Sequence, residues 1–390
     1  MSDWRIINTD VIDGLQSLDE QSIQCVVTSP PYWGLRDYGV DNQLGLEKTP
    51  EEYVDKMVSV FREVRRVLRD DGTVWLNLGD SYAGGGRNSG NAVENTSAKQ
   101  QTQIHSMHSG PSVVPQGLKP KDLCGIPWRV AFALQSDGWY LRSDIIWSKP
   151  NPMPESVTDR PTKAHEYLFL LTKSARYFYD ADAIREENQG DSGWEKQRQV
   201  GTAKTRKEEK TTGYNNRGRA DKTRQETMES NPAGRNKRSV WEITTQPFPE
   251  AHFAVMPTKL VEPCVLAGTS KEGQCVECGA VWERVVEKAE PIGRRDNGNG
   301  DRFVDKGMWS GRAGERDLKT IGWQPTCICN TNTEPHTVLD PFCGSGTVGV
   351  VALRHGRRFI GIDLSEEYCE MAKQRIDGDC PLFNREAQDE

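Results

Sequence analysis

The sequence predicts an α/β protein with a mostly parallel sheet, and three observations lead to this fold class. Apolar runs of strand length alternate with longer segments of helical periodicity. The alternation is clear at both ends of the chain but two polar stretches interrupt it, so we expect a core divided between the two ends. The chain has 390 residues, which is long for one domain and short for three, so we also expect sizeable insertions.

The N-terminal part of the chain supplies the first expected elements. Residues 49–68 give the clearest helix, because Thr49 and Glu52 form a capping box around Pro50 and the apolar residues that follow share one face. The other expected helices cover residues 11–18 and 127–135. The expected strands cover residues 5–8, 23–28, 73–78, 141–147 and 166–172.

The alternation resumes near the C-terminus. A strand over residues 337–339 leads into a glycine turn and a helix over residues 348–355, which Gly356 ends. A second strand covers residues 358–362, and the last helix begins at Ser365. These elements complete the expected core from the far end of the chain.

Charge is unevenly distributed along the sequence. The net charge of −7 disfavours a polyanionic partner at first sight, yet residues 190–238 contain thirteen Lys or Arg against seven Asp or Glu. A segment of this composition is either a solvated loop or a flexible arm that neutralises the phosphates of a nucleic acid.

The expected compartment determines how the cysteines are interpreted. No apolar run approaches the length of a membrane span, and the N-terminus lacks a basic segment followed by an apolar one, so we expect a cytoplasmic protein without a membrane partner. In that reducing compartment the ten cysteines are separate thiols or metal ligands. We expect buried core thiols at Cys25, Cys124, Cys264, Cys343, Cys369 and Cys380.

The other four cysteines have a spacing that suits zinc. Cys275 and Cys278 are separated by two residues, as in a zinc knuckle, and Cys327 with Cys329 could complete a four-thiolate site. The sequence therefore predicts a structural zinc in a ribbon, with scattered reduced thiols as the alternative.

The segment Asp340-Pro-Phe342-Cys-Gly344-Ser345-Gly346-Thr347 follows a predicted strand and opens a helix. Glycines in such a turn let the backbone approach a ligand closely, and the helix N-terminus favours an anionic group. Asp363 ends the next strand, where a carboxylate can accept hydrogen bonds from two ribose hydroxyls. The combination predicts a nucleoside-binding site.

A second motif, Ser29-Pro30-Pro31-Tyr32, follows the buried run of residues 23–28. Together the two motifs closely resemble those of the amino-methylating DNA methyltransferases, which carry an Asp/Asn/Ser-Pro-Pro-Tyr/Phe tetrad and a similar S-adenosylmethionine motif. The tetrad precedes the cofactor motif, which is the order of the permuted β class of that family.

The resemblance implies a Rossmann-like S-adenosylmethionine-dependent methyltransferase fold with a mixed, mostly parallel seven-stranded sheet that is circularly permuted. It also implies a basic target-recognition insertion beside the predicted zinc ribbon. The expected division of the chain is a catalytic half at residues 1–184 with a mobile loop at 84–121, a DNA-binding insertion at 185–245, a cofactor-side segment at 246–270, the zinc ribbon at 271–333 and a cofactor-binding half at 334–390.

The family also implies which residues form the site. Residues 252–268 resemble the segment at the methionine end of the cofactor, and Asn8-Thr9-Asp10 resembles the motif at its adenine end. The residues expected to bind S-adenosylmethionine are Asp10, Asp340, Phe342, Gly344, Ser345, Gly346, Thr347 and Asp363.

The tetrad suits an amine that is a poor nucleophile, because the lone pair of an exocyclic amine is delocalised into its ring. We expect the Ser29 oxygen and the Pro30 carbonyl, which Pro31 helps to orient, to accept hydrogen bonds from that amine. Tyr32, together with Trp33, is expected to stack on a base flipped out of duplex DNA. The amine then attacks the methyl group in line, without a covalent enzyme intermediate.

Residues 147–152, which include Lys149, resemble the target-base side of the family's pocket, together with Arg160, His165 and Glu166 downstream. Asp80 is expected at the edge of the pocket, where it would touch the base, and His165 is expected to be structural rather than catalytic.

Several alternatives remain at this point. Cytosine-N4 methylation is favoured because Ser is commoner than Asp at the first tetrad position of the cytosine enzymes, and adenine-N6 methylation is the runner-up. A non-catalytic DNA-binding adaptor is a remote alternative. Cytosine-C5 methylation is disfavoured because the Pro263-Cys264 pair lies in an apolar helix-like segment. The order of the motifs disfavours protein-glutamine and RNA methylation. The target sequence, a link to a restriction enzyme and the choice between monomer and homodimer stay open.

Overall fold

The computed structural model describes residues 3–34, 43–84, 114–115, 117–186, 234–246, 255–288, 318–329 and 331–379. The chain forms two units. The larger consists of Met1–Ile184, Arg238–Arg284 and Trp323–Glu390, and the smaller of Arg185–Lys237 and Val285–Gly322. Most of the predicted basic insertion and of the 84–121 loop, as well as residues 252–254 and Cys380, lie outside the described residues.

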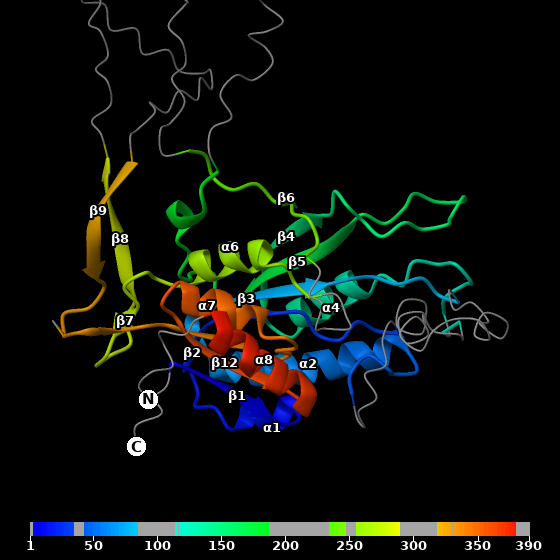
Figure 1. The fold of residues 1–390 in the computed structure, drawn as a ribbon, viewed down its shortest axis with the longest axis horizontal. Coiled ribbons are helices and arrows are strands. Elements are labelled where there is room, and N and C mark those ends of the chain that lie inside the picture. The colour runs from blue at the N-terminus through cyan, green and yellow to red at the C-terminus, as the bar shows by residue number, and fades with distance from the viewer. Residues whose placement is uncertain are drawn as a thin grey trace, which may run out of the picture. The chain divides into compact units, whose positions relative to one another are not determined.

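An eight-stranded sheet forms the centre of the larger unit (Figure 1). Its strands, in spatial order, are β1 (Trp4–Asn8), β12 (Arg358–Asp363), β11 (Thr337–Asp340), β2 (Ile23–Thr28), β3 (Leu68–Leu78), β5 (His165–Thr172), β4 (Tyr140–Ser148) and β6 (Val240–Glu242). The first five are parallel to their neighbours, β5 is antiparallel to β3 and β4, and β6 is parallel to β4. The expected mixed, mostly parallel sheet is confirmed. All seven expected strands are present, and the short β6 adds an eighth at the edge.

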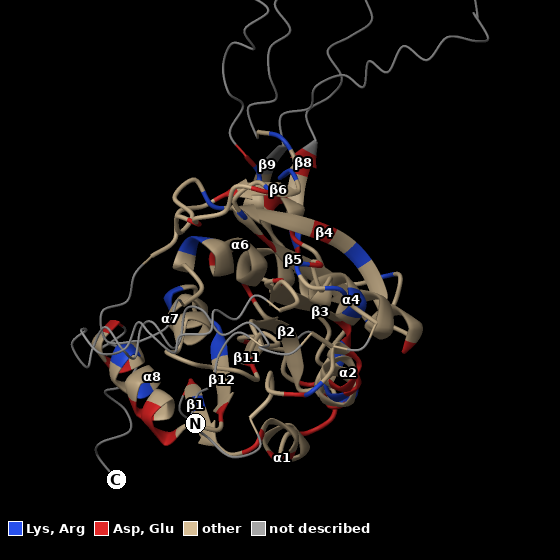
Figure 2. Ribbon diagram, turned by 90° about the vertical axis from the view of Figure 1, so that its right-hand side faces the viewer, with Lys and Arg blue, Asp and Glu red and all other residues tan. Residues whose placement is uncertain are grey.

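Among the described residues, three helices pack against each face of this sheet, and Figure 2 shows the resulting layers. One face carries α1 (Val11–Gln16), α2 (Pro50–Val67) and α4 (Ile126–Ser136), and the other carries α6 (Thr258–Gly268), α7 (Thr347–Arg354) and α8 (Glu366–Asp379). Successive residues of a strand point to opposite faces, so Val74 and Leu76 contact the first layer while Trp75 contacts the second. The short 3-10 helix η1 (Ala181–Ile184) packs beside α6.

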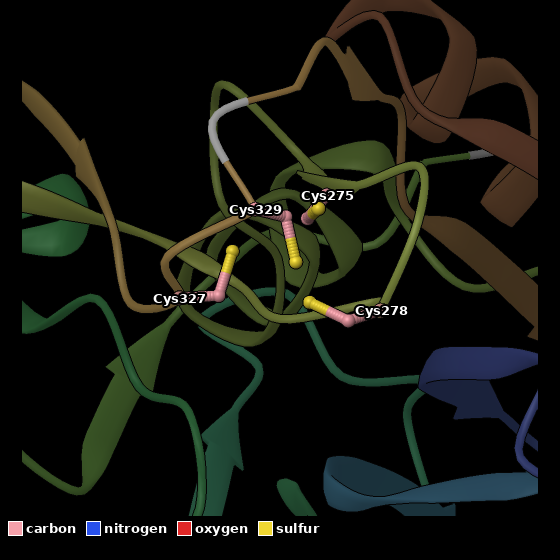
Figure 3. A group of neighbouring side chains, drawn as sticks. All are labelled: Cys275, Cys278, Cys327 and Cys329. Atoms are coloured by element: carbon pink, nitrogen blue, oxygen red, sulfur yellow. The ribbon is translucent and has the colours of Figure 1, made fainter.

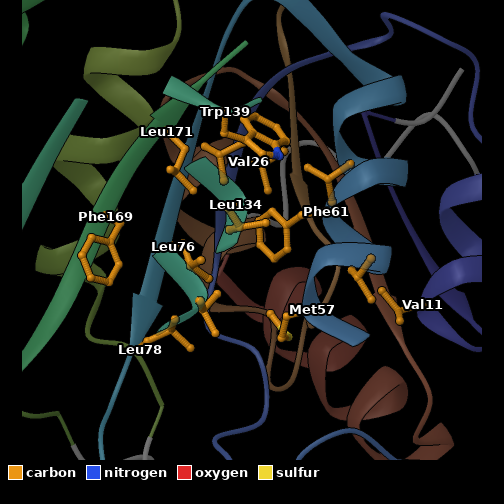
Figure 4. Close-up of a cluster of buried hydrophobic side chains, with 14 of the residues drawn as sticks. Val11, Val26, Met57, Phe61, Leu76, Leu78, Leu134, Trp139, Phe169 and Leu171 are labelled. Carbon is orange, nitrogen blue, oxygen red and sulfur yellow. The ribbon is translucent and has the colours of Figure 1, made fainter. Parts of the chain in front are cut away.

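Helix α2 begins where the capping box predicts. The Thr49 hydroxyl accepts a hydrogen bond from the Glu52 N–H at 3.2 Å, and the Glu52 carboxylate accepts one from the Lys48 N–H at 3.0 Å. The apolar face of α2 then enters the core, where Figure 4 shows Met57 and Phe61 among the buried side chains. Phe61 meets Trp139 edge to face, with ring centroids 6.4 Å apart.

The two ends of the chain meet in the middle of the sheet. Strands β2 and β11 are parallel neighbours, with Val338 opposite Cys25 and Leu339 opposite Val26. Because neighbouring parallel strands end at the same edge of a sheet, the tetrad after β2 and the glycine turn after β11 lie close together. The Thr28 hydroxyl donates to Asp340 Oδ1 at 2.7 Å and joins the two strand ends directly.

The predicted ribbon contains two small sheets. Strand β7 (Gln274–Cys275) pairs with β10 (Thr333–Glu334), and β8 (Trp282–Lys288) pairs with β9 (Leu318–Pro325). No helix among the described residues is long and apolar enough to cross a membrane.

Candidate active site

A cavity opens at the carboxyl edge of the sheet, between the tetrad and the glycine turn. Both ends of the chain line it, together with residues from the middle of the sequence. Eleven of the twelve residues predicted for catalysis and cofactor binding are on its wall: Asp10, Ser29, Pro30, Pro31, Tyr32, Asp340, Phe342, Gly344, Ser345, Thr347 and Asp363. The structure therefore brings the two motifs to one cavity.

Gly346 is the predicted residue that does not line the cavity. It has a φ of 75° and precedes the first residue of α7, and a Cβ at this position would lie 2.9 Å from the Cβ of Ala372 in α8. Its role in the structure is to allow a left-handed turn and the close packing of α7 against α8. Arg375 of α8 holds the same turn by donating to the Ser345 carbonyl and to the Ser345 and Thr347 hydroxyls.

Asp363 fixes the conformation of the glycine turn. Its two carboxylate oxygens accept hydrogen bonds from the Gly344 N–H at 2.7 Å and the Ser365 N–H at 2.9 Å. Burial raises the pKa of Asp363 above its ordinary value, and these two hydrogen bonds oppose the shift. At the other side of the cavity Asp10 caps α1, because its Oδ1 accepts a hydrogen bond from the Ile12 N–H at 2.8 Å.

Asp340 is almost completely buried at the cavity wall. Burial raises its pKa to about 7, although hydrogen bonds from the Thr28 hydroxyl and the Phe342 N–H favour the charged form; the nearby Asp363 raises the pKa further. Three carboxylates thus line the cavity wall, from Asp340, Asp363 and Asp10. Among the described residues, none of the hydrogen bonds to these carboxylates comes from a cationic side chain.

Hydrogen bonds from neighbouring residues fix the tetrad loop. The Tyr53 hydroxyl donates to the Pro31 carbonyl at 2.8 Å, and the Gly34 N–H donates to the Gly45 carbonyl at 2.7 Å. The prediction that Trp33 stacks on a base is wrong. Its side chain is only 1% exposed and its Nε1 donates to the Glu47 carbonyl at 2.9 Å, because the ring fills the core beneath the loop.

Three more polar residues meet at the cavity: Lys149 and Glu166, which the resemblance placed on the base side, and Asn77, which sequence reasoning missed. The Tyr32 hydroxyl lies 2.7 Å from Glu166 Oε2 and 3.1 Å from Asn77 Oδ1, and Lys149 Nζ pairs with Glu166 Oε1. All three line the cavity. The available signal for Asn77 was an amide side chain near the end of the apolar strand β3, which meets β5 only after the antiparallel pairing is known.

Asp80 and His165 do not line the cavity. Asp80 instead caps α4, since its carboxylate accepts hydrogen bonds from the Gly125 and Ile126 N–H groups, each at 3.1 Å. This position corrects the expectation that Asp80 touches the base. The His165 ring packs edge to face on Tyr167, with ring centroids 5.3 Å apart.

The four ribbon cysteines come together as their spacing predicts (Figure 3). The sulfur atoms of Cys275, Cys278, Cys327 and Cys329 all lie within 4.8 Å of one another. A tetrahedral site with Zn–S bonds of about 2.3 Å requires sulfur atoms about 3.8 Å apart, so small side-chain rotations would suit the four thiolates to zinc. The knuckle is already formed, because the Gly279 N–H donates to the Cys275 carbonyl at 2.8 Å.

The remaining described cysteines are buried as expected. They are Cys25, Cys124, Cys264, Cys343 and Cys369. Cys264 lies within α6 and its thiol donates to the Leu260 carbonyl, so it is a core thiol rather than a nucleophile at the cavity.

Comparison with known proteins identifies the class to which this fold and site belong. The chain matches the model of the N6/N4 DNA methylase family over residues 23–276 and 326–374. It is 40% identical over 370 residues to the Type II methyltransferase M.Cfr9I of Citrobacter freundii, an alignment that covers 95% of this chain and 86% of that protein. It is 38% identical over 372 residues to M.SmaI of Serratia marcescens, and this alignment covers 95% of this chain and 90% of that protein.

A solved structure shows the same fold. The PvuII DNA methyltransferase, described as cytosine-N4-specific, aligns with a TM-score of 0.50 at 17% identity over 99% of this chain and 93% of its own. The chain therefore belongs to the N6/N4 DNA methylase family and has the methyltransferase fold that the two motifs implied.

Proposed function

We propose that this protein is a DNA methyltransferase that transfers a methyl group from S-adenosylmethionine to the exocyclic N4 of cytosine. One observation carries the proposal: a tetrad that begins with Ser29 shares a cavity with the glycine turn of residues 340–347. The similarity to M.Cfr9I and M.SmaI, both called Type II methyltransferases, supports a place in a restriction-modification system.

The cofactor would lie along the glycine turn. Asp363 and Asp10 would hold its nucleoside part, while Phe342, Gly344, Ser345 and Thr347 line the same wall. The donor set fits a cationic ligand, because burial raises the pKa of Asp340 to about 7 and a nearby positive charge would stabilise its carboxylate. When bound, S-adenosylmethionine supplies a methyl group on a positively charged sulfur.

The tetrad would hold the base opposite this methyl group. Flipping a base out of duplex DNA costs a few kcal/mol, which stacking on the Tyr32 ring would offset. The Ser29 oxygen and the Pro30 carbonyl would accept hydrogen bonds from the exocyclic amine and direct its lone pair toward the methyl group. Much of the rate would come from this alignment of the two reacting atoms.

The four-cysteine cluster would hold a structural zinc ion. Its donor set of four sulfurs is one that structural zinc sites use, and such sites leave no position open for chemistry. Arg69 ties the knuckle to the core of the larger unit by donating to the Gly279 carbonyl at 2.6 Å.

Product analysis tests the proposed function. The purified protein is incubated with unmethylated DNA and S-adenosylmethionine, and the DNA is digested to nucleosides and analysed by mass spectrometry. We expect N4-methylcytosine, and N6-methyladenine as the sole product would instead establish the adenine alternative. Ser29→Ala should lower the rate on the order of 100-fold, the scale for losing one contact to a reacting group. Ser59→Ala, on the exposed face of α2, is the matched control and should leave the rate unchanged.

A further inference from the structure

A chain of hydrogen bonds leads from the tetrad to a largely buried ion pair. The Ser29 hydroxyl lies 3.2 Å from the Tyr32 hydroxyl, which lies 2.7 Å from Glu166 Oε2. On its other oxygen Glu166 pairs with Lys149, and the two side chains are only 16% and 18% exposed. The Lys149 ammonium also lies 4.3 Å from the centre of the Trp147 ring.

The direction of these hydrogen bonds follows from counting protons. The Tyr32 hydroxyl has one proton and faces two acceptors, Glu166 Oε2 and Asn77 Oδ1. The Asn77 amide is held with its oxygen toward Tyr32, because its Nδ2 donates to the Tyr167 carbonyl at 3.0 Å. Glu166 is closer and charged, so it takes the larger share of the proton. Both acceptors draw the Tyr32 proton away from Ser29.

This direction determines what Ser29 presents to the cavity. With its own proton directed to Glu166 and Asn77, the Tyr32 oxygen can only accept from Ser29, whose single proton then points at Tyr32. The Ser29 oxygen is left with lone pairs toward the cavity. An exocyclic amine offers N–H donors, so a serine fixed as an acceptor is complementary to it.

The charge that orders this chain is maintained at neutral pH. Burial by itself would raise the pKa of Glu166, but the charge and hydrogen bond of Lys149, together with the Tyr32 hydroxyl, hold it below its ordinary value. Glu166 is therefore a carboxylate under assay conditions, and it accepts from both neighbours.

We propose that Glu166 is a positioning residue, which acts through the Tyr32 hydroxyl to fix Ser29 as a hydrogen-bond acceptor for the target amine. The inference rests on the proposed function, and it gives the tyrosine of the tetrad a role that phenylalanine could not perform. It applies whether the amine belongs to cytosine or adenine, since both offer N–H donors.

A double-mutant cycle between Glu166 and Tyr32 tests this role. In Glu166→Gln the amide oxygen would stay with Lys149, which turns the NH₂ group toward Tyr32. This donor competes with Ser29 for the lone pairs of the Tyr32 oxygen, while Asn77 Oδ1 still accepts the Tyr32 proton. We expect kcat to fall roughly 10- to 100-fold, the scale for one charge-assisted hydrogen bond, with little change in the KM for DNA or cofactor. Tyr32→Phe removes the link and frees the Ser29 hydroxyl to rotate, so we expect a loss of the same order.

The double variant gives the decisive result. If Glu166 acts through Tyr32, the two losses are not additive, and the double variant has the kcat of Tyr32→Phe alone. Rates are measured as total tritiated methyl on DNA, so that N6-methyladenine as the product would overturn the cytosine assignment without affecting this cycle. Glu155→Gln, which alters an ion pair with Arg160 away from the cavity, is the control and should keep the wild-type kcat.

Three outcomes would overturn the inference. One is a double variant that is less active than either single variant, because independent structural losses would accumulate. Another is a Glu166→Gln protein with wild-type kcat. The third outcome applies if the Glu166→Gln protein does not fold and Tyr32→Phe is measured alone. A wild-type kcat in Tyr32→Phe would then show that the hydroxyl link has no role.

Discussion

At the scale of single residues, Gly79 limits where the Tyr32 ring can lie. A Cβ at position 79 would be 2.5 Å from Cε2 of that ring, closer than two carbon atoms can approach. Gly79→Ala should therefore displace Tyr32 and lower kcat on the order of 100-fold, the cost of misplacing a reacting group by about 1 Å. Steady-state methyl-transfer rates with saturating cofactor would measure the effect.

The matched control for this substitution is Gly378→Ala in α8, where a Cβ would meet nothing within 4 Å. That variant should retain full activity and gain up to about 1 kcal/mol of stability from better helix propensity. A fully active Gly79→Ala protein would show that the Tyr32 ring is not confined as the structure indicates.

Asp340 should make the stability of the ligand-free protein depend on pH. Its folded pKa is raised to about 7 by burial, whereas an unfolded aspartate titrates near 3.9. Between these values the folded state binds more protons than the unfolded state, so the free energy of unfolding falls as pH rises from about 4 to 7. Asp340→Asn should reduce this fall, by an amount on the order of a few kcal/mol.

Urea unfolding at pH 5 and pH 8 would measure that difference, with Asp13→Asn on the exposed side of α1 as the control that keeps the wild-type dependence. An Asp340→Asn protein whose stability falls between the two pH values as much as wild type would show that Asp340 is ionised throughout.

At the scale of elements, the ribbon should depend on its metal. Four thiolates close together repel one another, and a zinc ion would neutralise them while joining the knuckle at Cys275 to the segment at Cys327. We expect one zinc per chain by elemental analysis, its loss in Cys278→Ser, and a lower melting temperature after chelation. Cys124→Ala removes a buried thiol outside the cluster and should keep the metal. Freshly purified protein without stoichiometric zinc would exclude a structural zinc site.

Elements with strong local signals were predicted well. Helix α2 begins at its capping box, and the strands that end at the tetrad and at Asp340 are buried runs bounded by turn residues. These signals are local, because a cap or an apolar period requires no knowledge of distant neighbours. The glycine turn was also predicted from local sequence, and both Gly344 and Gly346 adopt the positive φ values that favour glycine.

Features that arise from strand pairing were missed. The Lys149–Glu166 pair exists because β4 and β5 are antiparallel with Trp147 opposite Glu166, a register that no local pattern records. Trp33 was misjudged because only the packed structure shows that its ring is beneath the loop. The short β6 gains its strand character from pairing with β4 rather than from its own three residues.

At the scale of the whole molecule, one ligand should affect segments that are about three hundred residues apart in the chain. Strands β2 and β11 are adjacent, and the cavity joins the tetrad to the glycine turn. S-adenosylmethionine at 100 times its dissociation constant stabilises the folded state by about 2.7 kcal/mol, and the loops that it contacts should open less often. Hydrogen exchange followed by mass spectrometry should therefore slow in peptides that cover residues 9–12 and in those that cover residues 341–347.

The four-cysteine cluster provides the internal control for that experiment, because residues 276–282 do not line the cavity and should exchange at the same rate with and without ligand. Protection of the 341–347 peptides alone would mean that the N-terminal segment does not contribute to cofactor binding. The cofactor would then be bound by the C-terminal half of the core alone, and the N-terminal half would supply only the tetrad. Protection at both ends would instead show that the cofactor closes a site which neither half of the core forms by itself.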